Sequence, residues 1–215
     1  MAAMWKLSVI GIIIASLLAG FIFYYVTSLS AKKEKKKQAE TILSLLINFV
    51  IFIWVGKIVL NIALFIKDPL VILAYPSDSK AFYFAILAIC VQVAYKVKRK
   101  QLDGYLLVTS FIPIFLFGSL TYEFIQMVSL GDDIAFSYIV LLVFLVLLYL
   151  LLQGKTRWMT ASFFVMFLWS IGKLLLLFFE PYTSVFGYML HPIFYAVSAI
   201  LFLSVLIREF KRRLI

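Results

Sequence analysis

Cysteine and histidine are almost absent from this chain, which contains one residue of each. The single cysteine, Cys90, cannot form a disulfide within the chain, and zinc sites in proteins require several nitrogen or sulfur ligands. The sequence also lacks a glycine-rich phosphate loop, an acidic metal-binding motif and an internal repeat. We therefore predict neither a metal ion nor a cofactor for this protein.

Charged residues are also scarce: they form 14% of the 215 residues, whereas 65% are hydrophobic. A soluble domain averages roughly 45–50% apolar residues, and the mean hydropathy of this chain is +1.10. No soluble core could hide this much apolar surface, so the solvent must be lipid. A membrane span needs about 20 apolar residues, and seven such stretches use most of the chain.

The predicted fold is accordingly all-α, a polytopic integral membrane bundle of seven transmembrane helices that forms one transmembrane domain over residues 1–215. The predicted spans are residues 7–29, 41–66, 80–95, 104–127, 134–152, 158–179 and 192–206.

Basic residues fall on alternate sides of these spans, which sets the predicted orientation. Of the 20 basic residues, 15 lie in the loops after spans one, three and five and at the C-terminus: Lys32, Lys33, Lys35, Lys36, Lys37, Lys96, Lys98, Arg99, Lys100, Lys155, Arg157, Arg208, Lys211, Arg212 and Arg213. The positive-inside rule then places the N-terminus outside and the C-terminus in the cytoplasm. We predict a multi-pass protein of a plasma membrane, of the bacterial kind.

The net charge of +10 is interpreted mainly as this orientation signal. A nucleic-acid partner would need a basic patch on a binding fold, which the chain lacks, so none is predicted. The lysine run at 32–37 has two interpretations at this stage. It is either a solvated loop that stops membrane transfer, or a segment that touches anionic lipid headgroups at about 1 kcal/mol per charge.

Ionisable residues inside spans are the candidate functional residues, because burying a charge in lipid costs several kcal/mol unless it faces the bundle or water. Lys57 lies in span two with Asn61 one turn later, Glu123 lies in span four, and Lys173 lies in span six, which Glu180 closes. In the predicted orientation these charges fall in the outer half of the membrane. If they converge, Lys57 and Lys173 form a cationic pocket with one carboxylate, suited to a phosphate headgroup.

A structural interpretation of the same residues stays open. Lys57 and Lys173 can also extend from lipid-facing positions toward the surface, and Glu123 can pair with one of them and hold helices together. In the functional interpretation, Lys57, Lys173, Asn61 and Glu180 bind the substrate, and Glu123 sets the charge balance or acts as a base.

The order of these features resembles a known family, the prolipoprotein diacylglyceryl transferases, which have seven spans in this orientation. Val55-Gly56-Lys57-Ile58 is similar to the family's Gly-Ala-Arg-Leu, and residues 68–73 (Asp-Pro-Leu-Val-Ile-Leu) to its following Pro-Leu segment. Residues 95–103 are similar to its basic loop. Residues 169–173 (Trp-Ser-Ile-Gly-Lys) and 178–181 (Phe-Phe-Glu-Pro) are similar to its aromatic and arginine-bearing span and the Phe-Phe-Arg-Glu-Pro stretch that ends it.

Most of the family's catalytic signature is missing, which implies a distant and catalytically degenerate relative. Residues 79–82 (Ser-Lys-Ala-Phe) replace its His-Gly-Gly, and residues 118–123 keep only the first glycine of Gly-Arg-x-Gly-Asn-Phe. Two arginines of the family stand here as Lys57 and Lys173, and a lysine cannot bind phosphate with the two-pronged geometry of arginine.

The resemblance implies a lipid-handling protein of the exterior leaflet that binds an anionic phospholipid. If chemistry is retained, it implies transfer of a diacylglyceryl group from phosphatidylglycerol to a lipoprotein precursor; the sequence leaves open whether the chain is an enzyme. The alternative is a non-catalytic membrane partner or assembly factor. A small-solute transporter ranks third, because the cytoplasmic half of the spans is nearly all apolar and offers no continuous polar pathway.

Overall fold

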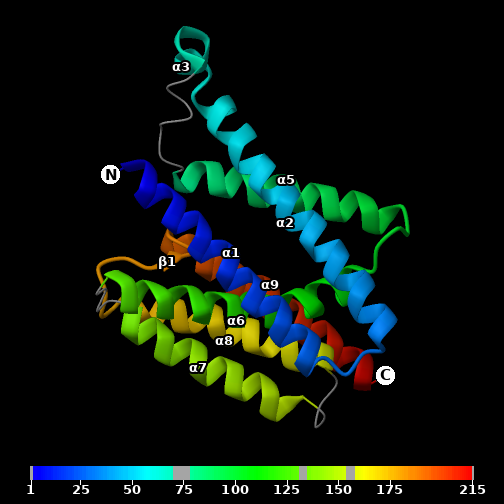
Figure 1. The fold of residues 1–215 in the computed structure, drawn as a ribbon. Coiled ribbons are helices and arrows are strands. Elements are labelled where there is room, and N and C mark those ends of the chain that lie inside the picture. Colours follow the sequence, from blue (N-terminus) through cyan, green and yellow to red (C-terminus); the bar gives the residue numbers. More distant parts are fainter. Residues whose placement is uncertain (1, 70–77, 131–134, 154–157, 215) are drawn as a thin grey trace. The chain divides into compact units, whose positions relative to one another are not determined.

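The computed structural model describes residues 2–69, 78–130, 135–153 and 158–214, and it is helical over most of that length (Figure 1). By length and composition, six helices could cross a membrane, and a seventh apolar helix, Phe136–Leu152, is shorter. The prediction of an all-helical, multi-pass membrane protein is confirmed at this level.

The chain divides into two compact units. Unit 1 comprises residues 1–31 and 108–215, and unit 2 comprises residues 32–107. Unit 1 holds α1 (Ala2–Thr27), most of α6 (Gly104–Leu130), α7 (Ala135–Leu152), α8 (Trp158–Leu176), β1 (Ser184–Val185), β2 (Tyr188–Met189) and α9 (Pro192–Leu214). Unit 2 holds α2 (Lys32–Leu60), α3 (Ile62–Lys67) and α5 (Ser79–Lys98).

Small residues bring α1 and α6 together in unit 1. A Cβ added at Gly20 would collide with the backbone carbonyl oxygen of Ile114, and one at Gly118 would lie 3.3 Å from the carbonyl oxygen of Ser16. Beside this contact, the rings of Phe23 and Phe117 stack with centroids 4.4 Å apart. Close backbone approach at small residues is a common way to join helices in lipid, where the hydrophobic effect does not drive them together.

Unit 2 is built on the packing of α2 against α5. The Phe49 and Phe82 rings meet edge to face at 5.3 Å, and Gly56 lets the Phe84 side chain approach to 2.9 Å of where a Cβ would stand. The absence of a side chain at Gly56 thus sets the distance between the two helices.

The predicted span 41–66 is wrong as one continuous helix, because α2 ends at Leu60 and the short α3 follows. Asn61 has a non-helical conformation, with φ −124° and ψ 36°. Its Nδ2 donates a hydrogen bond to the Lys57 carbonyl over 2.9 Å. A short polar side chain of this kind competes with the backbone ladder of the helix, which explains the break.

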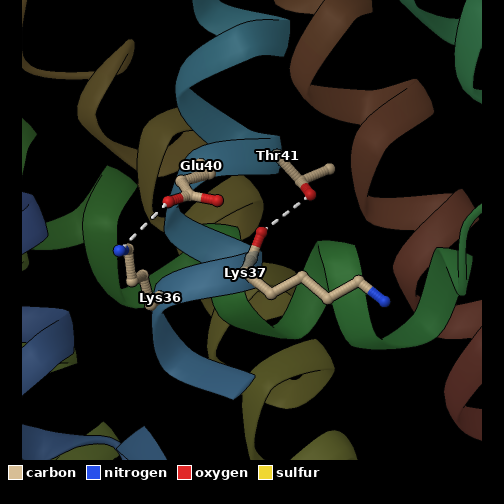
Figure 2. A network of polar contacts seen from close by, with 4 residues as sticks. All are labelled: Lys36, Lys37, Glu40 and Thr41. Carbon is tan, nitrogen blue, oxygen red and sulfur yellow. Dashed lines mark hydrogen bonds and ion pairs between the residues drawn. The ribbon is translucent and has the colours of Figure 1, made fainter. Parts of the chain in front are cut away.

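The lysine run was predicted to be a loop, and that prediction is also wrong, since α2 begins at Lys32. Figure 2 shows local contacts of this first part of the helix: Lys36 Nζ lies 3.9 Å from Glu40, and the Thr41 hydroxyl donates to the Lys37 carbonyl over 2.8 Å. Lysine, glutamate, glutamine and alanine, which fill residues 31–40, are good helix formers, so the helix extends beyond the apolar part.

The last two spans also differ from their predicted bounds. The sixth was predicted to reach residue 179, but α8 ends at Leu176, and the Phe178 and Phe179 side chains after it are 83% and 85% exposed. The seventh was predicted to end at residue 206, whereas α9 continues to Leu214. The basic residues Lys155 and Arg157 of the predicted loop lie outside the described residues.

Candidate functional site

The polar residues of unit 1 gather where the end of α8 meets α7 and the β1–β2 hairpin. Lys173 lies one turn before the end of α8, and its side chain is only 1% exposed. Its ammonium lies 3.0 Å from the centroid of the Tyr138 ring on α7. The same ammonium donates a hydrogen bond to the Ser184 carbonyl of β1 over 2.8 Å. Lys173 therefore joins two helices and the hairpin through one charged group.

Two carboxylates, those of Glu123 and Glu180, interact electrostatically with this ammonium. Glu123 on α6 is 6% exposed and has the larger Coulombic effect on Lys173, and Glu180, just after α8, has the smaller one. With all three groups ionised, one positive and two negative charges give this cluster a formal charge of −1. The predicted cationic pocket also includes Lys57, which belongs to unit 2, so that pocket stays a prediction; within unit 1 the two carboxylates outnumber the lysine.

Ser119 and Glu180 each contribute a buried polar atom with unused hydrogen-bonding capacity to the cluster. Ser119 is 2% exposed and its hydroxyl interacts with that of Tyr138, but its Oγ makes no well-aligned hydrogen bond with the described residues. The buried Oε1 of Glu180 likewise accepts none from them. Buried polar atoms in proteins are normally satisfied by protein, water or ligand. A molecule with both donors and acceptors would satisfy these atoms.

Helical spacing explains how these side chains share a face. Ser119 and Glu123 are four residues apart on α6, and Trp169 and Lys173 are four apart on α8, so each pair lies on one side of its helix. Trp169 Nε1 donates to the Tyr138 hydroxyl over 3.0 Å, which fixes the ring beneath the ammonium. Sequence reasoning found the charged member of each pair, and the same spacing would have pointed to Ser119 and Trp169.

The hairpin that receives Lys173 is held by aromatic contacts. Its two turn residues both have positive φ, 49° at Phe186 and 81° at Gly187, as a tight type I′ turn requires. A bulky residue in this conformation is unusual. Here the Phe186 ring packs against Tyr122 at 5.3 Å and Phe115 at 6.2 Å, which holds the turn in unit 1.

We expect Gly187→Ala to weaken this turn. Its φ of +81° is unfavourable for any residue with a Cβ, and the added atom would lie 2.8 Å from the Tyr122 hydroxyl. The loss in unfolding free energy should be about 1–3 kcal/mol, measured by thermal unfolding in detergent. Gly11→Ala is the control, because nothing lies within 4 Å of a Cβ there. Equal midpoints for both variants would contradict this account of the turn.

The other predicted binding residues lie in unit 2. Lys57 is 4% exposed and its ammonium is 4.5 Å from the centroid of the Trp54 ring. Asn61, one turn later, interrupts the helix as described above. A buried lysine next to a helix break places polar groups inside an otherwise apolar segment. Convergence of Lys57 with Glu123 and Lys173 stays a prediction.

Among the described residues, no group of three histidine, cysteine, aspartate or glutamate side chains is arranged to hold a metal ion. Comparisons of the chain with protein-family models, curated proteins and solved structures found no match. The resemblance to prolipoprotein diacylglyceryl transferases therefore stays a prediction that rests on the residues quoted for it.

Proposed function

We propose that this multi-pass membrane protein binds the headgroup of a glycerophospholipid at the cluster of Ser119, Glu123, Lys173 and Glu180. The observation that carries the proposal is the unused hydrogen-bonding capacity of Ser119 Oγ and Glu180 Oε1 in a cluster that also contains a buried lysine. An ammonium has three donors, and the Ser184 carbonyl takes one of those of Lys173. Donor and acceptor sites for a ligand thus occur together.

The charge of the cluster restricts the headgroup. A phosphate suits the remaining donors of Lys173, but a simple anion would be repelled by Glu123 and Glu180. A headgroup that adds hydrogen-bond donors avoids this conflict, because its hydroxyl or ammonium groups can donate to the Glu180 carboxylate. Phosphatidylglycerol and phosphatidylethanolamine have that chemistry, and phosphatidylcholine, whose ammonium carries no hydrogen, does not.

The leaflet follows from the predicted orientation. With the N-terminus outside, the end of α8 that carries Lys173 lies on the exterior side, so the lipid comes from the outer leaflet of a plasma membrane. The family resemblance supports a phospholipid as the ligand, and it makes Glu123 the candidate base if a transfer reaction is retained.

Native mass spectrometry of the detergent-purified protein tests this proposal. Glu180→Gln removes a charged acceptor, and we expect it to lower lipid affinity roughly 10- to 100-fold; Ser119→Ala should lower it roughly 2- to 10-fold. Ser170→Ala is the matched control, because Ser170 Oγ already donates to the Met166 carbonyl over 3.0 Å. Affinity for phosphatidylglycerol or phosphatidylethanolamine should fall in the first two variants only, and phosphatidylcholine should bind weakly throughout.

Unchanged retention of the same lipid in Glu180→Gln and Ser119→Ala would overturn the proposal. A second candidate function, a non-catalytic membrane partner, is favoured by one observation. The Lys173 ammonium already holds the hairpin through Ser184 and covers the Tyr138 ring, which is a structural task. That alternative predicts a membrane protein that co-purifies with the chain and is retained in both variants.

A further inference from the structure

The basic first turns of α2 form one continuous helix with the apolar segment that follows. Lys32, Lys33, Lys36 and Lys37 are exposed and Lys35 is half-buried. The helix then continues without interruption to Leu60. The heights and directions of these lysines relative to the membrane are therefore set by helix geometry, which a loop would not do. We call residues 32–37 the lysine collar.

Helix rise places the collar at the level of lipid headgroups. The apolar part begins at Thr41, and each residue adds about 1.5 Å, so Lys37 lies about 6 Å and Lys32 about 14 Å beyond the apolar edge. The headgroup layer of one leaflet is roughly 5–7 Å thick. Long, flexible side chains at Lys36 and Lys37 thus reach into this layer, and those at Lys32 and Lys33 reach its outer surface.

The lysines of the collar lie on the same side of α2 as its exposed apolar residues. Successive residues turn by about 100°, so the five lysines cover an arc of about 200° on one side of α2. The opposite side carries the buried residues Gln38, Ile42 and Leu45. In line with the lysines lie exposed apolar side chains of the same helix: Leu43, Ile47, Val50, Ile51 and Trp54. The exposed apolar face of α2 therefore continues into the lysines.

The charges within the first turns of α2 leave the collar with an excess of positive charge. The N-terminal end of a helix favours negative charge, but the first six residues of α2 contain five lysines and one acidic residue, Glu34. The ion pair of Lys36 with Glu40 is long, at 3.9 Å, and both side chains are largely exposed, so it contributes little. A layer of phosphates would offset both the helix dipole and the repulsion between lysines.

We propose that the lysine collar is a docking surface for anionic phospholipid headgroups in the leaflet next to the start of α2. The proposal is independent of the headgroup cluster around Lys173, since it uses a different unit and different residues. An acidic protein is the competing partner. The arc favours lipid, because it is continuous with the apolar face of α2 and lies at headgroup height.

Electron paramagnetic resonance with spin-labelled lipids tests the collar. The full chain is placed in phosphatidylcholine nanodiscs that contain traces of labelled phosphatidylglycerol or labelled phosphatidylcholine. A lipid in contact with one lysine gains about fivefold in association at about 1 kcal/mol per charge. The measured quantity is the association of labelled phosphatidylglycerol relative to labelled phosphatidylcholine, averaged over all lipids that contact the protein. This ratio should fall at least twofold in the variant Lys32→Gln/Lys33→Gln/Lys36→Gln/Lys37→Gln. High salt should remove the preference for phosphatidylglycerol in the wild type.

Two controls separate docking from general charge loss. The same four positions changed to arginine keep the charge and should keep the preference. Lys67→Gln/Lys80→Gln removes exposed charges outside the collar and should have no effect. Glutamine is a good helix former, so α2 should persist in all variants. An unchanged preference for phosphatidylglycerol in the four-glutamine variant would overturn the proposal. So would a lost preference if an acidic protein co-purified with the wild type and not with this variant.

Discussion

Gly20→Val is expected to cause one of the two largest losses of stability in this protein. A side chain at Gly20 would collide with the carbonyl oxygen of Ile114 and lie 3.2 Å from the backbone nitrogen of Gly118. These atoms belong to the backbone of α6 and cannot rotate away, so α1 and α6 must separate. Overpacking of this kind costs about 3 kcal/mol or more where the backbone has to move.

Gly11→Val is the matched control, because it makes the same change in the same helix at a point where none of the described atoms of neighbouring elements lies within 4 Å of the added Cβ. Thermal unfolding in detergent, followed by loss of the monodisperse peak in size-exclusion chromatography, measures both. We expect a large drop in midpoint for Gly20→Val and little change for Gly11→Val. Similar midpoints would show that α1 does not depend on its approach to α6.

Much of the helical organisation followed from hydropathy, since the thickness of the bilayer sets the length that an apolar segment must have. In the first span, Gly20 packs closely against the backbone of α6. Gly11, in the same helix, is exposed, and none of the described atoms of neighbouring elements lies within 4 Å of a Cβ added there. Spacing alone does not distinguish these two glycines, because the difference depends on which part of α1 lies against α6.

Element boundaries were harder to predict, because local polar groups override the hydropathy pattern. The side-chain amide of Asn61 bonds to the backbone one turn earlier and ends α2 inside an apolar run. At the other end of α2, charge suggested a loop, but intrinsic helix propensity extends the helix to Lys32. Hydropathy reports on burial in lipid and contains no information about either effect.

The candidate site was predicted in part. Glu123, Lys173 and Glu180 were found as charges in spans, because placing them in lipid demands an explanation, and the structure gives them a common electrostatic environment. The partners of Lys173 could not be found in this way. One is a backbone carbonyl, at Ser184, and the other is the face of the Tyr138 ring. Neither has a sequence signal, since every residue has a carbonyl and the chain has 12 tyrosines.

Lys173→Met is expected to give the other large loss of stability. The substitution removes the hydrogen bond to Ser184 and the positive charge over the Tyr138 ring. The Glu123 side chain, which is 6% exposed, then experiences the negative charge of Glu180 with no cation on α8 to offset it. Removing one partner of a buried charge pair costs about 3–5 kcal/mol, because the remaining charge is buried without compensation. Thermal and denaturant unfolding in detergent measure the loss. Lys80→Met is the control, because Lys80 is exposed, and it should change the unfolding free energy by less than about 0.5 kcal/mol.

A double-mutant cycle identifies the cause. Glu123→Gln neutralises the carboxylate that has the larger Coulombic effect on Lys173, so Lys173→Met/Glu123→Gln buries neither charge. The double variant should recover part of the loss caused by Lys173→Met, with a coupling energy of about 1–3 kcal/mol. Additive effects of the two substitutions would mean that Lys173 stabilises unit 1 through the hairpin and the Tyr138 ring, without Glu123. The coupling therefore separates the electrostatic role of Lys173, on which the headgroup proposal depends, from its attachment to Ser184.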